Sequence, residues 1–155
     1  MKTLQERFEE KYIPEAITGC WLWTGALSTE GYGRISMNNG LVQAHRIPWE
    51  MVHGAIPKGM ELDHVCHCRA CVNPEHVRLA TRAENSRNSL LRSNNTSGYK
   101  GVSFYKLTHK WEAYIKADYK RTRLGFFDTK DLAYAAYCEA AKKYHGEFAN
   151  FGERL

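Results

Sequence analysis

The 155-residue sequence lacks any apolar run near the roughly 18 residues that a membrane-spanning helix needs, and no signal-peptide pattern opens it. It also lacks the composition of a disordered chain, since 43% of its residues are hydrophobic and 25% are charged. These absences argue against membrane insertion and secretion. They favour a cytoplasmic globular protein of one or two small domains.

Neither sign of charge dominates the first 90 residues, where ten basic and ten acidic side chains cancel. Residues 91–155 carry twelve basic against seven acidic side chains, and this excess accounts for the whole net charge of +5. A basic excess confined to one part of a chain favours a polyanionic partner for that part. A solvated basic surface would have the same composition.

The number of cysteines is odd and three of them lie within six residues among histidines, which favours metal binding over a disulfide framework. The cysteines are Cys20, Cys66, Cys68, Cys71 and Cys138. Cys66, Cys71 and His76 follow one another at intervals of five residues, close enough to bind one zinc ion, and a structural zinc site needs four ligands. The spacing leaves Cys20, Cys68 and His67 open as the fourth. We expect Cys138, on an Ala- and Tyr-rich helix, to be a core residue.

Asp63, His64 and Asn85 flank this cysteine-rich loop and offer a different chemistry. A neutral imidazole can take a proton from water near neutral pH, and carboxylate and amide oxygens can hold a hard cation such as Mg²⁺ against a phosphate. The loop separates two expected short strands, at 60–64 and 77–80, and a helix is expected from 82 to about 92. The alternative is a purely structural zinc knot.

Several short motifs give this region a resemblance to a known family. They are GCWLWTG at 19–25, GYG at 31–33, AHR at 44–46, and His64, Cys66, Cys71, Asn73-Pro74, His76 and Asn85. The region resembles the HNH (ββα-metal, or His-Me finger) endonucleases, especially the Cys/His-box homing endonucleases and similar phage enzymes. Many HNH enzymes carry Asn at the middle motif position, whereas this sequence has His76 there.

The resemblance implies a role for each matching residue. His64 would be the general base, and Asn85 would bind a catalytic Mg²⁺ ion, with Asp63 as a second metal ligand. Arg46 would contact the scissile phosphate, although a salt bridge on a helix surface is an equal alternative. The structural zinc would be bound by Cys20, Cys66, Cys71 and His76.

The basic C-terminal part predicts a small sheet and a helix. The expected strands lie near 99–105, 110–118 and 121–127, and the expected helix runs from about 130 to 144. Residue alternation puts Glu112, Tyr114 and Lys116 on one face of the second strand, which leaves the apolar face to pack on the helix. The polar face can then meet nucleic acid.

The motifs YKGV (99–102), KWEAYIK (110–116), RLGFFDT (123–129) and HGEFANF (145–151) resemble the plant APETALA2/ethylene-response-factor DNA-binding domain. That resemblance implies a three-stranded sheet that enters the major groove. Carried over by position, the DNA-facing residues are Lys100, Ser103, Tyr105, Tyr114, Lys116, Arg121 and Arg123. Ser103 and Tyr105 replace Arg of the plant domains, and Arg123 replaces Trp, so the plant target sequence does not carry over.

The two resemblances together predict an α+β chain. A zinc-braced ββα-metal nuclease domain (1–92) would be followed by a linker (93–98) and by a three-stranded antiparallel sheet packed on one helix (99–155). The expected function is a homing endonuclease with one structural zinc and one Mg²⁺ that cuts double-stranded DNA, in a bacterial host's cytoplasm if it is phage-encoded.

The sequence leaves three questions about this function open. A homodimer would make a staggered break, whereas a monomer would more naturally nick one strand. A zinc-containing transcription regulator that binds DNA without cutting it is the main alternative. An RNA-binding zinc protein is the third candidate, and it would need exposed stacking aromatic side chains on the sheet.

Overall fold

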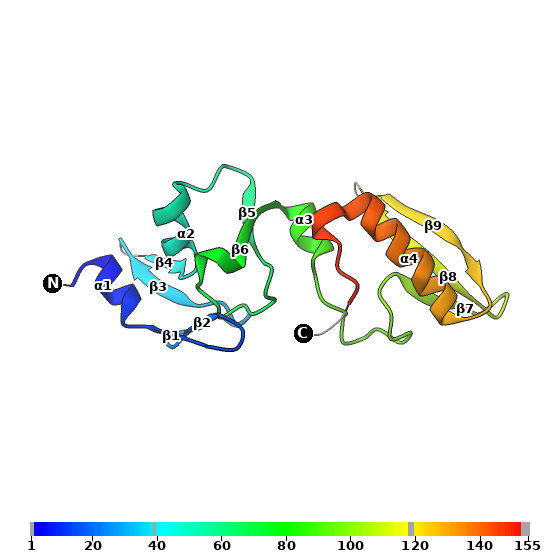
Figure 1. Ribbon diagram of the computed structural model, residues 1–155, viewed down its shortest axis with the longest axis horizontal. Coiled ribbons are helices and arrows are strands. Elements are labelled where there is room, and N and C mark those ends of the chain that lie inside the picture. Colours follow the sequence, from blue (N-terminus) through cyan, green and yellow to red (C-terminus); the bar gives the residue numbers. More distant parts are fainter. Residues whose placement is uncertain (1, 39, 118–119, 153–155) are drawn as a thin grey trace. The chain divides into compact units, whose positions relative to one another are not determined.

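The computed structural model describes residues 2–38, 40–117 and 120–152, which form small antiparallel sheets and four α-helices (Figure 1). The chain divides into two compact units, Met1–Thr81 and Arg82–Leu155, and each has a hydrophobic core of its own. Within the described ranges, every helix is too short or too polar to cross a membrane.

The first unit contains two short α-helices and three pairs of antiparallel strands, in which β1 pairs with β2, β3 with β4 and β5 with β6. Its elements are α1 (Leu4–Glu9), β1 (Tyr12–Pro14), β2 (Trp21–Trp23), β3 (Arg34–Met37), β4 (Gly40–Gln43), α2 (Arg46–His53), β5 (Met60–His64), the 3₁₀ turn η1 (Pro74–His76) and β6 (Val77–Thr81). The strands β5 and β6 therefore enclose the cysteine-rich loop, as the sequence predicts.

Side chains from separate sheets meet in one core in this unit. It is built from Phe8, Trp23, Ile35, Ala44, Ile47 and Val72. The Trp23 ring lies against Gly33, where a β-carbon would come within 2.8 Å of it. Because such a contact is too close for a real side chain, the second glycine of the GYG motif makes room for the core tryptophan.

The spacing of Leu4, Phe8 and Tyr12 at intervals of four predicts a helix over residues 1–12, and the helix in the structure is shorter. A capping box of Thr3 and Glu6 begins α1, as helix-start chemistry requires, but the helix ends at Glu9 and not near residue 12. Tyr12 is instead the first residue of β1, where its ring stacks on Trp21 at 4.8 Å. Strand pairing and ring packing outweigh the helical spacing of Tyr12.

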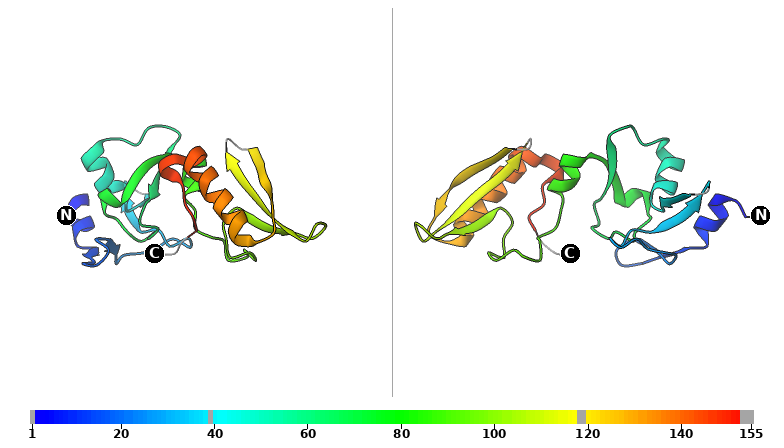
Figure 2. Two further views of the ribbon diagram at one scale, coloured as in Figure 1. Left: turned by 45° about the vertical axis from the view of Figure 1, so that its right-hand side comes forward. Right: turned by 180° about the vertical axis from the view of Figure 1, so that it is seen from behind.

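The second unit contains a short helix followed by a three-stranded antiparallel sheet in the order β7-β8-β9. Its elements are α3 (Arg82–Arg87), β7 (Val102–Tyr105), β8 (Lys110–Ala117), β9 (Lys120–Phe127), α4 (Lys130–His145) and the 3₁₀ turn η2 (Gly146–Phe148). Helix α4 covers one face of the sheet in both views of Figure 2. The predicted sheet-and-helix arrangement is present.

The ends of α4 follow from local chemistry, whereas the end of α3 does not. The Thr129 hydroxyl accepts from the backbone N–H of Leu132 at 3.2 Å, and Gly146, with φ of +53°, follows the last turn of α4. The residue types of Thr129 and Gly146 predict both helix ends from the sequence. Helix α3, however, ends at Arg87 and not near residue 92.

Candidate metal centre and nucleic-acid interface

Three cysteines and one histidine from separate segments of the first unit meet at one point. Cys20 precedes β2, Cys66 follows β5, Cys71 lies in the loop and His76 ends η1. Their four candidate ligand atoms all lie within 4.8 Å of one another. These are the four residues that the family resemblance proposes, and Cys68 and His67 stay outside the cluster among the residues that the structure describes.

The spacing of these atoms fits a zinc ion. The Nδ1 atom of His76 is 3.5 Å from Cys20 Sγ and 3.6 Å from Cys71 Sγ. Zinc bonds of about 2.3 Å to sulfur and 2.0–2.1 Å to nitrogen, at tetrahedral angles, separate the two ligand atoms by about 3.6 Å. The cluster could therefore hold zinc with little rearrangement.

Backbone pairing and one asparagine hold the ligand segments together. Val72 donates to the Trp21 carbonyl at 2.8 Å, and Trp23 donates to the Ala70 carbonyl at 2.9 Å. The side chain of Asn73 donates to the Gly19 carbonyl at 2.9 Å and accepts from the Glu75 N–H, which caps η1. The Asn-Pro pair in the sequence signals this cap, whereas the contact with Gly19 is visible only in the fold.

The polar surroundings of Cys71 favour its thiolate. The thiol of Cys66 and the backbone N–H of Asn73, which lies 3.4 Å from Cys71 Sγ, lower the pKa of Cys71 by hydrogen bonding. The same interaction with Cys71 raises the pKa of Cys66, followed by burial. A bound cation would favour the thiolate at both positions, because metal ligands must be deprotonated.

His64, the predicted base, ends β5 directly beside this cluster. Its side chain is buried, and its Nε2 lies 3.0 Å from the backbone carbonyl of Cys71. A carbonyl can only accept, so Nε2 carries the hydrogen and Nδ1 carries the lone pair. Burial lowers the pKa of His64, although the Cys71 carbonyl opposes this effect. The ring is therefore neutral near pH 7, as a general base must be.

His45 is a second buried histidine. It belongs to the AHR motif at 44–46, but the sequence assigns it no role. Its ring meets the His64 ring edge-on at 4.7 Å, and Tyr32 lies 5.8 Å from both rings. Burial, followed by the nearby His64 and Arg46, lowers the pKa of His45 to about 3. His45 thus packs on the candidate base as a neutral ring.

The other two predicted catalytic residues of this unit have visible partners. The carboxylate of Asp63 is buried and accepts from Arg78 Nε at 3.0 Å across the β5–β6 pair. Because neighbouring strand residues point to opposite faces, Asp63 and His64 project to different sides of β5. Arg46 is 3.6 Å from Glu50, so the surface salt bridge that the sequence allows is present.

Asn85 lies on α3 and so belongs to the second unit. His64 lies in the first unit. A catalytic site formed by His64 and Asn85 together therefore stays a prediction. The same applies to the predicted metal-binding role of Asp63 and the phosphate contact of Arg46.

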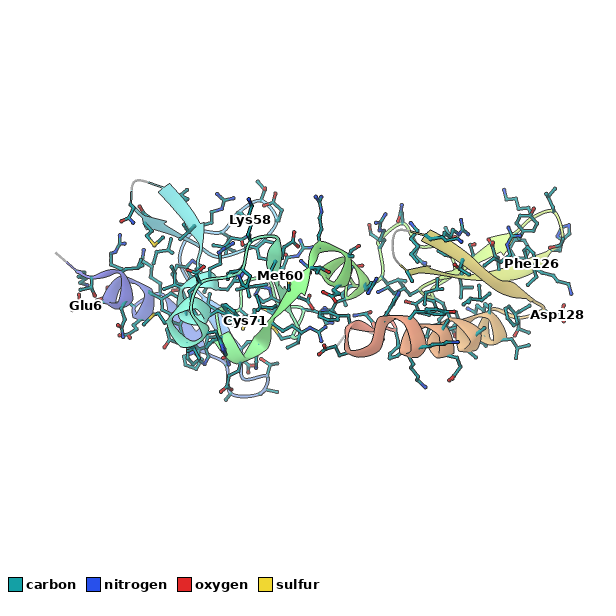
Figure 3. The ribbon with its side chains drawn as sticks, turned by 90° about the horizontal axis from the view of Figure 1, so that it is seen from above. Glu6, Lys58, Met60, Cys71, Phe126 and Asp128 are labelled. Carbon is teal, nitrogen blue, oxygen red and sulfur yellow. The ribbon has the colours of Figure 1, made fainter. Side chains whose placement is uncertain are left out.

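Most of the predicted DNA-facing residues lie on the sheet face opposite α4. Strand alternation and register place on it Ser103, Tyr105, Glu112, Tyr114, Lys116, Arg121, Arg123 and Phe126. Figure 3 labels Phe126 on β9. Alternation along β9 could have placed Phe126 on this face from the sequence. The contacts of Glu112 with two arginines are seen only in the structure.

Glu112 orders two arginines on this face. It is buried, and its two oxygens accept from Arg121 at 2.9 Å and from Arg123 at 2.7 Å. The guanidinium of Arg121 also lies 3.8 Å from the centre of the Tyr114 ring, and that of Arg123 lies 5.0 Å from the Phe126 ring. The result is an ordered layer of guanidinium groups over aromatic rings.

Lys100 behaves differently from the rest of the predicted DNA-facing set. Its ammonium group donates to the backbone carbonyls of Arg87 at 2.7 Å and Ser89 at 2.6 Å. Burial lowers the pKa of Lys100 to about 8. Its contact with DNA stays a prediction, while a structural contact within the second unit is present.

Comparison with known proteins places the chain in a family. A family model described as HNH endonuclease matches residues 42–87. Protein 2.8 of Escherichia phage T7 is 35% identical over 99 residues, covering 63% of this chain and 67% of the relative. Protein 3.8 of the same phage is 33% identical over 103 residues, covering 66% and 84%. The chain belongs to the HNH endonuclease family. Nuclease activity is the property that this family membership supports.

The second unit of this HNH protein has relatives of another kind. APETALA2-like protein 2 of Oryza sativa is 43% identical over 60 residues, covering 39% of this chain but only 14% of the plant protein. This likeness supports the predicted APETALA2-like region and, through it, DNA as the partner. No solved structure matches the chain.

Proposed function

We propose that this chain is a homing-type DNA endonuclease that hydrolyses phosphodiester bonds with His64 as general base and one divalent metal ion. One observation carries the proposal. His64 is buried, neutral and oriented by the Cys71 carbonyl, directly beside four atoms that fit a zinc ion. A general base needs a lone pair on one ring nitrogen and a fixed orientation of the ring.

A structural zinc on Cys20, Cys66, Cys71 and His76 would support this geometry. The carbonyl that orients His64 belongs to Cys71, whose sulfur is one of the four candidate ligands. Fixing that sulfur would fix the carbonyl and, through it, the imidazole ring. Outer partners of this kind commonly set the orientation of functional groups around a metal.

The reaction would be a hydrolysis in which His64 Nδ1 takes a proton from water. The water oxygen attacks phosphorus, the bond to the 3′ oxygen breaks, and that oxygen takes a proton from solvent, which leaves 5′-phosphate and 3′-hydroxyl ends. A Mg²⁺ ion held by Asn85, with Asp63 as the second candidate ligand, would neutralise charge on the phosphate and on the departing oxygen. Arg46 would contact the scissile phosphate by leaving its exposed ion pair with Glu50.

Residues 99–155 would bind double-stranded DNA and direct the nuclease of residues 1–92, and residues 93–98 would link the two. Two features support this division. The residues beyond 90 hold the entire net positive charge, and Glu112 holds Arg121 and Arg123 in fixed positions on the open sheet face. Arginines already ordered before binding lose less entropy when they contact DNA.

A basic cavity next to this face supports the same role. It has a volume of about 610 Å³ and is lined by parts of α3, β7, β8 and α4 and of the segment between α3 and β7. Among the described residues that line it, none is acidic. Its cationic lining residues are Arg82, Arg87, Arg92, Lys100 and Lys116. A surface of one charge sign suits the phosphates of a DNA backbone.

The experiment that tests the proposed function is incubation of the protein with supercoiled plasmid and Mg²⁺. We expect nicked or linear plasmid, and no cleavage when EDTA replaces Mg²⁺. Asn85→Ala should lose this activity, whereas Asn85→Asp, which keeps an oxygen ligand, should retain part of it. Intact plasmid after incubation with folded, zinc-loaded protein would point instead to a DNA-binding regulator. Linear product without a nicked intermediate would indicate paired sites in a homodimer.

A further inference from the structure

The end of α3 is held by side chains from the DNA-binding part of the second unit. The last carbonyl groups of a helix have no partners within the helix and need them from elsewhere. Lys100 donates to the carbonyls of Arg87 and Ser89 at 2.7 and 2.6 Å. Asn150 donates from Nδ2 to the carbonyl of Asn88 at 3.1 Å. Three consecutive carbonyls therefore have external donors.

The contact between Asn150 and Asn88 is buried, that between Lys100 and Arg87 is partly buried, and that between Lys100 and Ser89 is exposed. Asn88 and Asn150 are both 7% exposed, and burial lowers the pKa of Lys100. A buried ammonium group needs hydrogen-bond acceptors, and two of the three donors of Lys100 are used on this helix end. The Asn150–Asn88 contact is thus shielded from the solvent that weakens surface pairs.

Both donors are themselves part of the sheet-and-helix module. Lys100 stands two residues before β7, next to Tyr99, whose ring stacks on Tyr134 of α4 at 4.4 Å. The backbone carbonyl of Asn150 accepts from the buried Tyr137 hydroxyl of α4 at 3.1 Å. The side-chain oxygen of Asn150 accepts from Gly152 at 2.7 Å. Each end of the module therefore supplies one anchor for α3.

Helix α3 also needs such anchors, because it spans only six residues. Isolated helices shorter than about 12–15 residues are marginal in water. The segment after it is not a plain tether either. Asn95 and Ser97 both donate to the Tyr99 carbonyl, at 3.0 and 2.9 Å, and Ser97 is buried. The chain between α3 and β7 is thus organised by the module that follows it.

We propose that Lys100 and Asn150 are positioning residues that fasten the metal-binding helix α3 to the DNA-binding module. The inference rests on the proposed function, in which Asn85 of α3 binds the catalytic metal. Under it, the part of the protein that contacts DNA also sets the position of a metal ligand. A nuclease with a merely tethered DNA-binding module would show no such dependence.

The test uses the full chain with Asn150→Asp. This substitution keeps the oxygen that accepts from Gly152 and removes the donor to Asn88. Plasmid nicking is measured with protein in excess, at saturating DNA, over a range of Mg²⁺ concentrations. We expect at least about a tenfold lower maximal rate or a tenfold higher half-saturating Mg²⁺ concentration, with zinc content unchanged. Asn38→Asp, the same change at an exposed turn of the first unit, should match wild type.

Lys100→Met is the second variant, and it removes the ammonium group while keeping most of the stem. Saturating DNA removes any effect of this change on DNA affinity from the measured rate. We expect the same lower maximal rate or higher half-saturating Mg²⁺ concentration. Hydrogen exchange on wild-type protein provides a measurement without mutation. The Asn88 amide donates to the Glu84 carbonyl at 3.1 Å, and it should be protected to the same degree as the amides of β8.

Each outcome decides the proposal. Wild-type rates and Mg²⁺ dependence in either folded variant, or free exchange at Asn88, would overturn the anchoring while leaving the nuclease function intact. Failure of wild-type protein to cleave, or full activity of Asn85→Ala, would overturn the proposed function and this inference with it. If both variants unfold, the exchange measurement alone decides.

Discussion

Cys71 joins the candidate metal centre to the candidate base through separate atoms. Its sulfur lies 3.6 Å from His76 Nδ1 and accepts from the Asn73 N–H, while its carbonyl lies 3.0 Å from His64 Nε2. The side chain, which Figure 3 labels, is fully buried. A change at this residue should therefore affect both metal binding and the orientation of the imidazole.

Replacing Cys71 by Ser should remove the zinc. We expect about one zinc per chain in wild type and little in Cys71→Ser, because a structural site needs all four ligands. The first unit should also lose cooperative unfolding, since zinc binding supplies much of the folding free energy in such sites. Elemental analysis and circular dichroism check both points.

Cys138→Ser is the matched control, because it makes the same change at a half-buried cysteine of α4 outside the cluster. It should keep the zinc. A full zinc complement in folded Cys71→Ser protein would contradict the assigned ligand set.

At this scale the sequence predicts the types of functional residue better than their partners. The spacing of Cys66, Cys71 and His76 points to a metal site, and the family resemblance selects Cys20. The contact of His45 with His64 depends on chain segments nearly twenty residues apart. No local pattern could announce it.

Among the elements, β7 and the turn before it depend on one glycine. Gly101 has φ of +69°, and a β-carbon there would lie 2.1 Å from the Tyr137 ring and 2.7 Å from the Tyr114 carbonyl. Tyr137 is buried in the core of the second unit, so its ring cannot easily move away. Only a residue without a side chain fits between the sheet and α4 at this point.

Gly101→Ala should destabilise the second unit. Gly98 is a matched control, since it also has a positive φ, of +80°, but a β-carbon added there would meet no described atom within 4 Å. Gly98→Ala should cost about 1–2 kcal/mol from the left-handed backbone alone. Gly101→Ala should cost about 1–3 kcal/mol more, from the steric overlap. Urea unfolding, monitored by NMR signals of the second unit, measures the difference. Equal losses in the free energy of unfolding for the two variants would contradict the packing described.

The open face of the sheet gives a prediction about DNA binding. Arg123→Ala should weaken DNA binding and reduce the salt dependence by about one phosphate contact. Lys142→Ala, which removes an exposed cation from α4, should have a smaller effect on both quantities. Binding measured in EDTA over a range of salt concentrations tests this. Equal salt dependence of DNA binding for wild type and Arg123→Ala would contradict a role of this sheet face in DNA binding.

The elements were predictable where their signals are local. Helix α4 begins after Thr129 and ends before Gly146, as these residue types predict. Alternation along β8 correctly predicts which side chains lie on each face of the sheet. The early end of α1 follows from pairing of Tyr12 with β2, and that of α3 coincides with donors from Lys100 and Asn150. These ends are set by contacts from distant segments, which a local pattern does not contain.

On the scale of the whole molecule, two units divide the chemistry. The first carries the Cys/His cluster and His64, and the second carries the ordered arginines and Asn85. The chain's net positive charge lies beyond residue 90. Family membership supports nuclease activity for this arrangement, and the two-part division of labour is the proposal that the charges and contacts favour.

The most direct test of the proposed mechanism is plasmid cleavage by His64→Ala. Removing a general base should lower the cleavage rate by ~10²–10⁴-fold. DNA affinity in EDTA and zinc content should stay at wild-type levels, because His64 is outside the four-residue cluster. His53→Ala, which changes an exposed histidine at the end of α2, should cleave normally. Undiminished cleavage by folded, zinc-loaded His64→Ala protein would contradict the proposed mechanism.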